Sequence, residues 1–179
     1  TLVANPNESM SFERVVNTPK RGIGPTSIEK LRDFAATNNM SLLTATQNIM
    51  LANQISTSVR NKLDGFAQEM RAIQDQADEL SITELTDLIL ERTGYRKALQ
   101  DEAEKSLQAQ SRLDNLDEFK SVTQEFDKNN ADDAANAQEK LTRFLTDLAL
   151  VSPQDDIEDQ ENTVTLMTLH AAKGLEFPV

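Results

Sequence analysis

The chain has 179 residues, of which 27% are charged and 38% hydrophobic, with a formal net charge of −12; these values suit one soluble globular domain with its own core. Cysteine is absent and histidine occurs once, which excludes disulfides, cysteine-ligated metals and multi-histidine metal sites. No apolar run approaches roughly 18 residues and no secretory leader is visible, so we expect a cytoplasmic chain with no membrane partner. The start, Thr1-Leu2-Val3-Ala4 without Met, suggests a piece of a longer protein.

Helical patterns begin at residue 8, where a short apolar face is followed by a turn at 19–25. Thr26 and Glu29 have the spacing of a capping box, which predicts the start of the next helix. Asn38 and Asn39 predict its end, and a short helix is expected at 41–50.

The longest regular signal is an apolar seam with alternating steps of four and three residues, over about three heptads. It consists of Val59, Leu63, Phe66, Met70, Ile73, Ala77 and Leu80. A coiled coil and a long amphipathic helix lying on a bundle both fit this pattern. The mixed side-chain sizes and the stop at Leu80 favour the amphipathic helix.

Three further helices are predicted after this seam. Ser81 and Glu84 form a second capping box, and Gly94 fits a helix end. One helical stretch is expected over 95–127, a polar break over 129–136, and a last helix that Ser152-Pro153 ends.

The composition of the chain changes after residue 152. Residues 153–162 read PQDDIEDQEN, an acidic linker that lacks the glycine of a calcium loop. Residues 163–167 are of strand type, with no partner strand elsewhere in the sequence. The expected fold is therefore mainly α, a multi-helix bundle-like domain with a helix-hairpin-helix-like GIG turn and a C-terminal orphan strand.

The turn at 19–25 carries the clearest binding chemistry. Gly22 and Gly24 flank Ile23 just before a predicted helix, where backbone N–H groups and the positive helix end would face a phosphate. Residues 14–32 hold five cationic side chains against Glu29 alone, a local charge of +4 on an acidic body. The candidate duplex-DNA contacts, through the backbone and not the bases, are Lys20, Arg21, Gly22, Ile23, Gly24 and Thr26.

The chain has no G-x-x-x-x-G-K-[ST] loop, since none of its five glycines has that spacing. We therefore predict that the chain alone binds no triphosphate and has no cofactor, no metal site and no catalytic residue of its own.

Residues 164–179 read VTLMTLHAAKGLEFPV. The string TLHAAKGLEF at 168–177 resembles the motif V segment of the UvrD/PcrA/Rep family of superfamily 1 DNA helicases, PcrA-type members in particular. Residues 5–6 and 11–31, with the glycine turn, are similar to the 2B subdomain block of the same family. The turn also resembles the helix-hairpin-helix class of DNA-backbone binders.

The resemblance implies a parent protein that hydrolyses ATP with Mg²⁺ and unwinds DNA in the 3′ to 5′ direction during replication and repair. It implies hinge stubs of the second motor domain at 1–7 and 163–179, a helical 2B-like subdomain at 8–152 and an acidic linker at 153–162. The isolated piece would be inactive as an enzyme and would regulate the motor by holding the duplex ahead of the fork.

By the same resemblance, Thr168 and His170 would contact single-stranded DNA in the parent, and Glu176 would contact the ribose of ATP. Expected partners are duplex DNA, single-strand/duplex junctions, the other helicase domains, and repair or replication proteins. An alternative remains open. Acidic helix faces, with Asp75 and Asp101 among their carboxylates, could instead make the chain a helical protein-interaction module without DNA contact.

Overall fold

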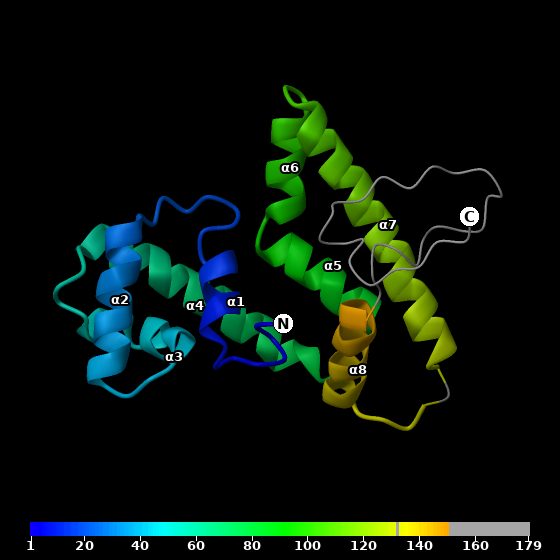
Figure 1. Ribbon diagram of the computed structural model, residues 1–179, viewed down its shortest axis with the longest axis horizontal. Helices are drawn as coiled ribbons and strands as arrows, with labels where there is room; N and C mark the ends of the chain where they lie inside the picture. The colour runs from blue at the N-terminus through cyan, green and yellow to red at the C-terminus, as the bar shows by residue number, and fades with distance from the viewer. Residues whose placement is uncertain (132, 151–179) are drawn as a thin grey trace, which may run out of the picture.

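The computed structural model describes residues 1–131 and 133–150, and all regular structure in this part is helical (Figure 1). The mainly helical prediction is therefore confirmed for the described residues. The acidic linker, the orphan strand and the motif V string all lie outside them. In chain order the elements are α1 (Ser9–Val15), α2 (Pro25–Thr37), α3 (Leu42–Gln47), the 3-10 turn η1 (Ile49–Leu51), α4 (Thr57–Ala77), α5 (Ile82–Arg92), α6 (Tyr95–Ala103), α7 (Leu107–Asn129) and α8 (Ala137–Leu150).

Two hydrophobic cores are joined by the long helix α4. Helices α1 to α3 pack around one half of α4, and α5 to α8 gather at its other half (Figure 1). Leu63, Phe66 and Met70 of α4 belong to the first core, whereas Ile73 belongs to the second. The apolar seam of this helix is therefore satisfied within the chain, so the amphipathic-helix alternative is the observed one.

Several helix ends follow from local sequence, as expected. Ser81 and Glu84 make the reciprocal capping box at the start of α5. Gly94 has φ +65° just after α5, the left-handed conformation that ends many helices. Asn38 caps the C-terminus of α2, and Asn39 follows it with φ +53°.

The predicted capping box of Thr26 and Glu29 is wrong. Helix α2 begins at Pro25, with Gly24 as its N-cap and no side-chain cap bond. Proline suits the first helical position because its fixed φ fits the helix and its missing N–H is not needed there. Thr26 thus lies inside the first turn, where its hydroxyl stays exposed.

The single helix predicted over 95–127 is also wrong, because the chain turns back between α6 and α7. Ser106 accepts a hydrogen bond from the Ala109 N–H and starts the second helix. Leu107 fits the apolar spacing of a continuous helix over 95–127, but it is 92% exposed at this turn. The two helices form an antiparallel hairpin (Figure 1). No helix among the described residues is both long and apolar enough to cross a bilayer.

Candidate nucleic-acid interface

The glycine turn lies in the loop that joins α1 to α2. The Ile23 side chain is 4% exposed and is part of the first core, whereas the glycines on either side of it are exposed. Lys20 and Thr26 are exposed as well. One buried anchor thus holds the loop while its backbone and its polar side chains face solvent.

Asn17 organises this loop. Its Oδ1 accepts hydrogen bonds from the N–H groups of Arg21 at 2.8 Å and Ile23 at 3.4 Å, and its Nδ2 donates to the Ile23 carbonyl at 3.2 Å. Asparagine side chains often replace backbone partners in turns. Sequence reasoning assigned Asn17 no role, although an asparagine just before a proline–glycine turn was the available signal.

Arg21 faces the protein and not the solvent. Its Nη2 donates to Glu69 of α4 at 2.8 Å, its Nη1 donates to the Thr18 carbonyl at 3.2 Å, and its guanidinium lies 5.1 Å from the centre of the Phe66 ring. Its side chain is only 13% exposed. The structure therefore gives Arg21 the task of fixing the loop onto α4, and its charge is offset by Glu69.

A lysine distant in sequence joins the loop instead. The Lys62 ammonium of α4 donates to the Gly22 carbonyl at 3.2 Å and is exposed. Lys62 was missed because 40 positions separate it from Gly22 and no local pattern connects them. Lys20 and Lys62 thus place two exposed cations at the turn.

Of the other cationic residues in 14–32, only some are free to bind a phosphate. Arg32 is bound by Glu13 through two hydrogen bonds of 2.7 Å. The hydrogen bond from Arg32, together with its charge, lowers the pKa of Glu13, although slight burial acts in the opposite direction. Arg14 and Lys30 are exposed and form no ion pair within the described part of the chain.

The two glycines differ in what the fold requires of them. Gly22 has φ +68°, which strains any residue with a side chain. Gly24 has φ −81°, an ordinary value, and a Cβ added there would meet no atom within 4 Å. Among the described residues, the N–H groups of Gly24 and Thr26 have no acceptor. Packing within the chain therefore leaves Gly24 bare at an exposed helix N-terminus.

The candidate motif V residues lie outside the part of the chain that the structure describes; they are Thr168, His170 and Glu176. Within residues 1–131 and 133–150, no three carboxylate or imidazole side chains come together as metal ligands.

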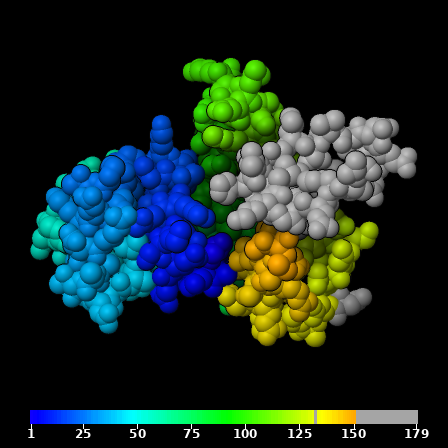
Figure 2. All heavy atoms as spheres, viewed as in Figure 1, coloured from blue at the N-terminus to red at the C-terminus, as the bar shows by residue number. Residues whose placement is uncertain are grey.

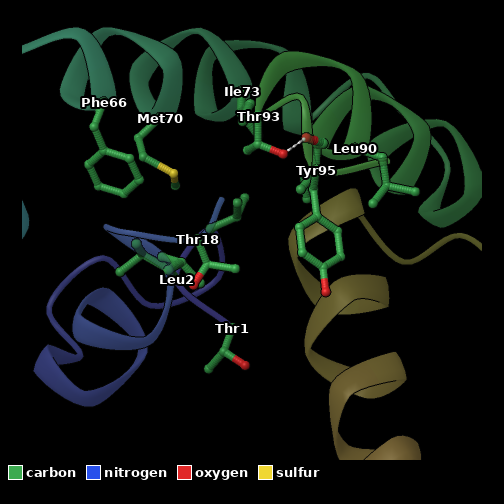
Figure 3. A pocket seen from close by; sticks show the side chains of 12 residues that line it. Thr1, Leu2, Thr18, Phe66, Met70, Ile73, Leu90, Thr93 and Tyr95 are labelled. Carbon is green, nitrogen blue, oxygen red and sulfur yellow. Dashed lines mark hydrogen bonds between the residues drawn. The ribbon is translucent and has the colours of Figure 1, made fainter. Parts of the chain in front are cut away.

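An apolar pocket of about 270 Å³ lies between the two cores (Figure 3). Phe66, Met70 and Ile73 of α4 form one wall, and Leu2 lies on the opposite wall (Figure 3). Its polar side-chain groups are hydroxyls, with no carboxylate or imidazole among the described lining residues. It therefore offers no acid–base pair, and the exposed loop is the better candidate site.

Comparison with known proteins places this geometry in context. The family model described as the UvrD-like helicase C-terminal domain matches residues 1–179. The chain is similar to ATP-dependent DNA helicase PcrA of Bacillus subtilis (strain 168), with 47% identity over 184 residues, and to that of Leuconostoc citreum, with 45% identity over 179 residues. The Staphylococcus epidermidis relative with the same name is 39% identical over 178 residues. These alignments cover 99–100% of this chain but only 23–24% of each relative.

Proposed function

The chain belongs to the UvrD-like helicase C-terminal domain family, and from this premise we propose that it is the duplex-binding, regulatory 2B-type subdomain of an ATP-dependent 3′ to 5′ DNA helicase. Because it spans about a quarter of its relatives' length, ATP hydrolysis with Mg²⁺ and DNA unwinding are assigned to the whole protein. The chain's own share is contact with DNA.

The exposed glycine loop carries this proposal. Gly24 brings bare backbone to an exposed helix start, the exposed Lys20 belongs to the same loop, and Lys62 donates to the carbonyl of Gly22. A phosphate oxygen suits such a surface, since it accepts from backbone N–H groups and is attracted by nearby ammonium groups. The contact reads the sugar-phosphate backbone and is independent of base sequence.

The buried side of the loop supports the same function by holding the loop in one shape. Asn17 fixes its backbone, Ile23 anchors it in the core, and Arg21 fastens it to α4. A loop that is ordered before binding loses little conformational freedom on binding. Arg21 and Ile23 therefore act as positioning residues, while Lys20, Gly22, Gly24 and Thr26 would meet the phosphates.

In the parent protein, residues 8–152 would form the 2B-like subdomain, with 1–7 and 163–179 in the second motor domain and 153–162 as the linker. Thr168 and His170 would contact the tracked single strand, and Glu176 the ribose of ATP. Swinging on its two hinges, the subdomain would hold or release the duplex ahead of the fork and so regulate unwinding in replication and repair.

Fluorescence anisotropy with a labelled duplex that carries a 3′ single-stranded tail tests the proposal directly. Binding by the 179-residue chain should weaken with salt by about 0.9 log units of affinity per log unit of salt for each phosphate contact. The Lys20→Ala/Lys62→Ala variant should bind more weakly and lower this slope by about 1.8. Both side chains are exposed, and the variant loses one hydrogen bond, from Lys62 to the Gly22 carbonyl, so circular dichroism should show an unchanged helical content.

The matched control is Lys128→Ala/Lys140→Ala, which removes the same charge from α7 and α8 at the other end of the molecule (Figure 1). If both double variants bind the duplex as well as the unmodified chain does, the loop is not a DNA site. The protein-interaction alternative would then stand in its place.

A further inference from the structure

We infer that the DNA-binding surface continues from the glycine loop across a cleft to the α6–α7 hairpin, where Arg112 makes a second contact with a phosphodiester backbone. This inference rests on the proposed function of the loop. It adds a binding residue from a different part of the chain.

The cleft lies between the loop and the hairpin and has a volume of about 540 Å³. Its loop wall consists of residues 17–20, and its other wall is formed by the 95–102 face of α6 together with Arg112 of α7. The loop leaves α1 beside the start of α6 (Figure 1), and the space-filling surface recedes between this loop and the α6–α7 hairpin (Figure 2). A sugar-phosphate segment that touches Lys20 is thereby brought to the cleft.

The charges at the cleft favour an anionic backbone. Lys20 and Arg112 line opposite walls, and neither forms an ion pair with any described residue. Two other cations of the hairpin are already neutralised, since Arg96 is bound to Asp117 and Lys120 to Asp87. A guanidinium without a partner can donate two parallel hydrogen bonds to one phosphate.

Glu102 also lines the cleft and opposes an anion there. Among the described lining residues, two cations and one carboxylate leave a local charge of +1, on a chain with a net charge of −12. The Tyr95 hydroxyl in the lining can donate to a phosphate oxygen, whereas the Thr18 hydroxyl already donates to the Arg14 carbonyl at 3.0 Å and the Asn17 amide is bonded to the loop backbone. Of the lining residues that the structure describes, Tyr95 alone is aromatic, so these walls suit a backbone better than stacked bases.

A substitution of Glu102 distinguishes a DNA contact in the cleft from a purely structural effect. Removing its charge by Glu102→Gln should tighten DNA binding about threefold, because a carboxylate beside a phosphate repels it. Arg112→Ala should weaken binding about tenfold and lower the salt slope by about 0.9 for duplex or 0.7 for single-stranded DNA. Both residues are exposed, and circular dichroism of each variant should match that of the unmodified chain.

The experiment uses the 179-residue chain with two probes, a blunt duplex and an unpaired oligonucleotide, over a range of salt concentrations. The probe whose slope falls in Arg112→Ala identifies the kind of strand that occupies the cleft. Lys128→Ala, on the far end of α7, is the single-charge control and should change neither affinity by more than about twofold.

The possible failures are distinguishable. If Lys20→Ala/Lys62→Ala weakens binding but Arg112→Ala changes neither affinity nor slope, the extended contact is wrong and the loop site stands. Unchanged or weaker binding by Glu102→Gln would likewise contradict DNA binding in the cleft. If no loop variant affects binding, the proposed function fails and this inference fails with it.

Discussion

At the scale of single residues, two glycines separated by one residue in the same loop have different reasons for being glycine. Gly22 needs to be glycine because of its own backbone, whose φ is +68°. At Gly24 the fold imposes no such need, because an added Cβ would point into open space. A partner that approaches the backbone closely would explain why this position is glycine.

Alanine substitutions separate these two reasons. Gly22→Ala should lower the free energy of unfolding by about 1 kcal/mol, because it forces a left-handed φ and displaces the Lys62 ammonium, 2.9 Å from the new Cβ. Gly24→Ala removes a favoured N-cap residue without a steric clash, so it should lower the free energy of unfolding by at most about 1 kcal/mol and still weaken duplex binding. Urea denaturation and anisotropy measure the two effects. If Gly24→Ala binds duplex DNA with full affinity, the phosphate does not approach the Gly24 backbone closely.

Arg21 gives a second prediction at this scale. Arg21→Ala should destabilise the chain by about 1–3 kcal/mol, because Glu69 and several loop carbonyls lose their partner. Arg21→Lys should recover little of this, since an ammonium cannot reproduce the planar contact with Phe66. Thermal unfolding measures both. An Arg21→Ala chain of normal stability that binds DNA poorly would return Arg21 to the role of a direct DNA contact.

At the scale of elements, helix α5 is capped twice at its N-terminus. Ser81 provides the local capping box. Asp127, from the end of α7, accepts hydrogen bonds from the N–H groups of Ile82 at 3.0 Å and Thr83 at 2.8 Å. A carboxylate there also interacts favourably with the positive helix end, so one side chain ties α7 to α5.

This contact predicts a pH-dependent part of the stability. Burial disfavours ionisation of Asp127, but hydrogen bonds from Thr83, Ile82 and Ser81 outweigh it, so its pKa is lowered on folding. The stabilisation is therefore complete above the unfolded-state pKa of about 3.9 and is lost as pH falls through the lower folded-state pKa.

Asp127→Asn should accordingly lower the free energy of unfolding by about 1–2 kcal/mol at pH 7. This difference from the unmodified chain should shrink towards pH 3. Urea denaturation across this pH range measures the difference. The exposed neighbour Lys128→Ala serves as the control. A cost that stays constant from pH 7 to pH 3 would show that the carboxylate charge does not matter.

At the scale of the whole molecule, α4 belongs to both hydrophobic cores. Leu63 and Ile73 are each fully buried, and they lie ten positions apart on the same continuous helix but in different cores. A helix shared in this way transmits the loss of one core to the other, so we expect the described part of the chain to unfold as one cooperative unit.

The corresponding prediction uses one variant in each core. Leu63→Ala and Ile73→Ala should each cost about 2–5 kcal/mol. In both variants, helical circular dichroism and the fluorescence of Tyr95, the only tyrosine in a chain without tryptophan, should report the same midpoint. If Leu63→Ala lowers the circular dichroism midpoint but not that of Tyr95, the two halves unfold separately.

The sequence alone determined the features that depend on neighbouring residues. The helical content, the Ser81 capping box and the Gly94 helix end were all predictable, because each rests on propensities and hydrogen bonds within a few positions. The break between α6 and α7 was missed because Leu107 kept the apolar spacing although no partner covers it.

Only the tertiary structure decided which cations are free to meet a ligand. Glu69 neutralises Arg21, Lys62 arrives from α4, and Arg112 faces Lys20 across a cleft. The residues of these pairs are 40 or more positions apart, and no periodicity in the sequence encodes their contact. Charge composition indicated that a basic cluster exists, but packing determined which of its members stay exposed, because a paired and shielded charge attracts a phosphate far less than a solvent-facing one.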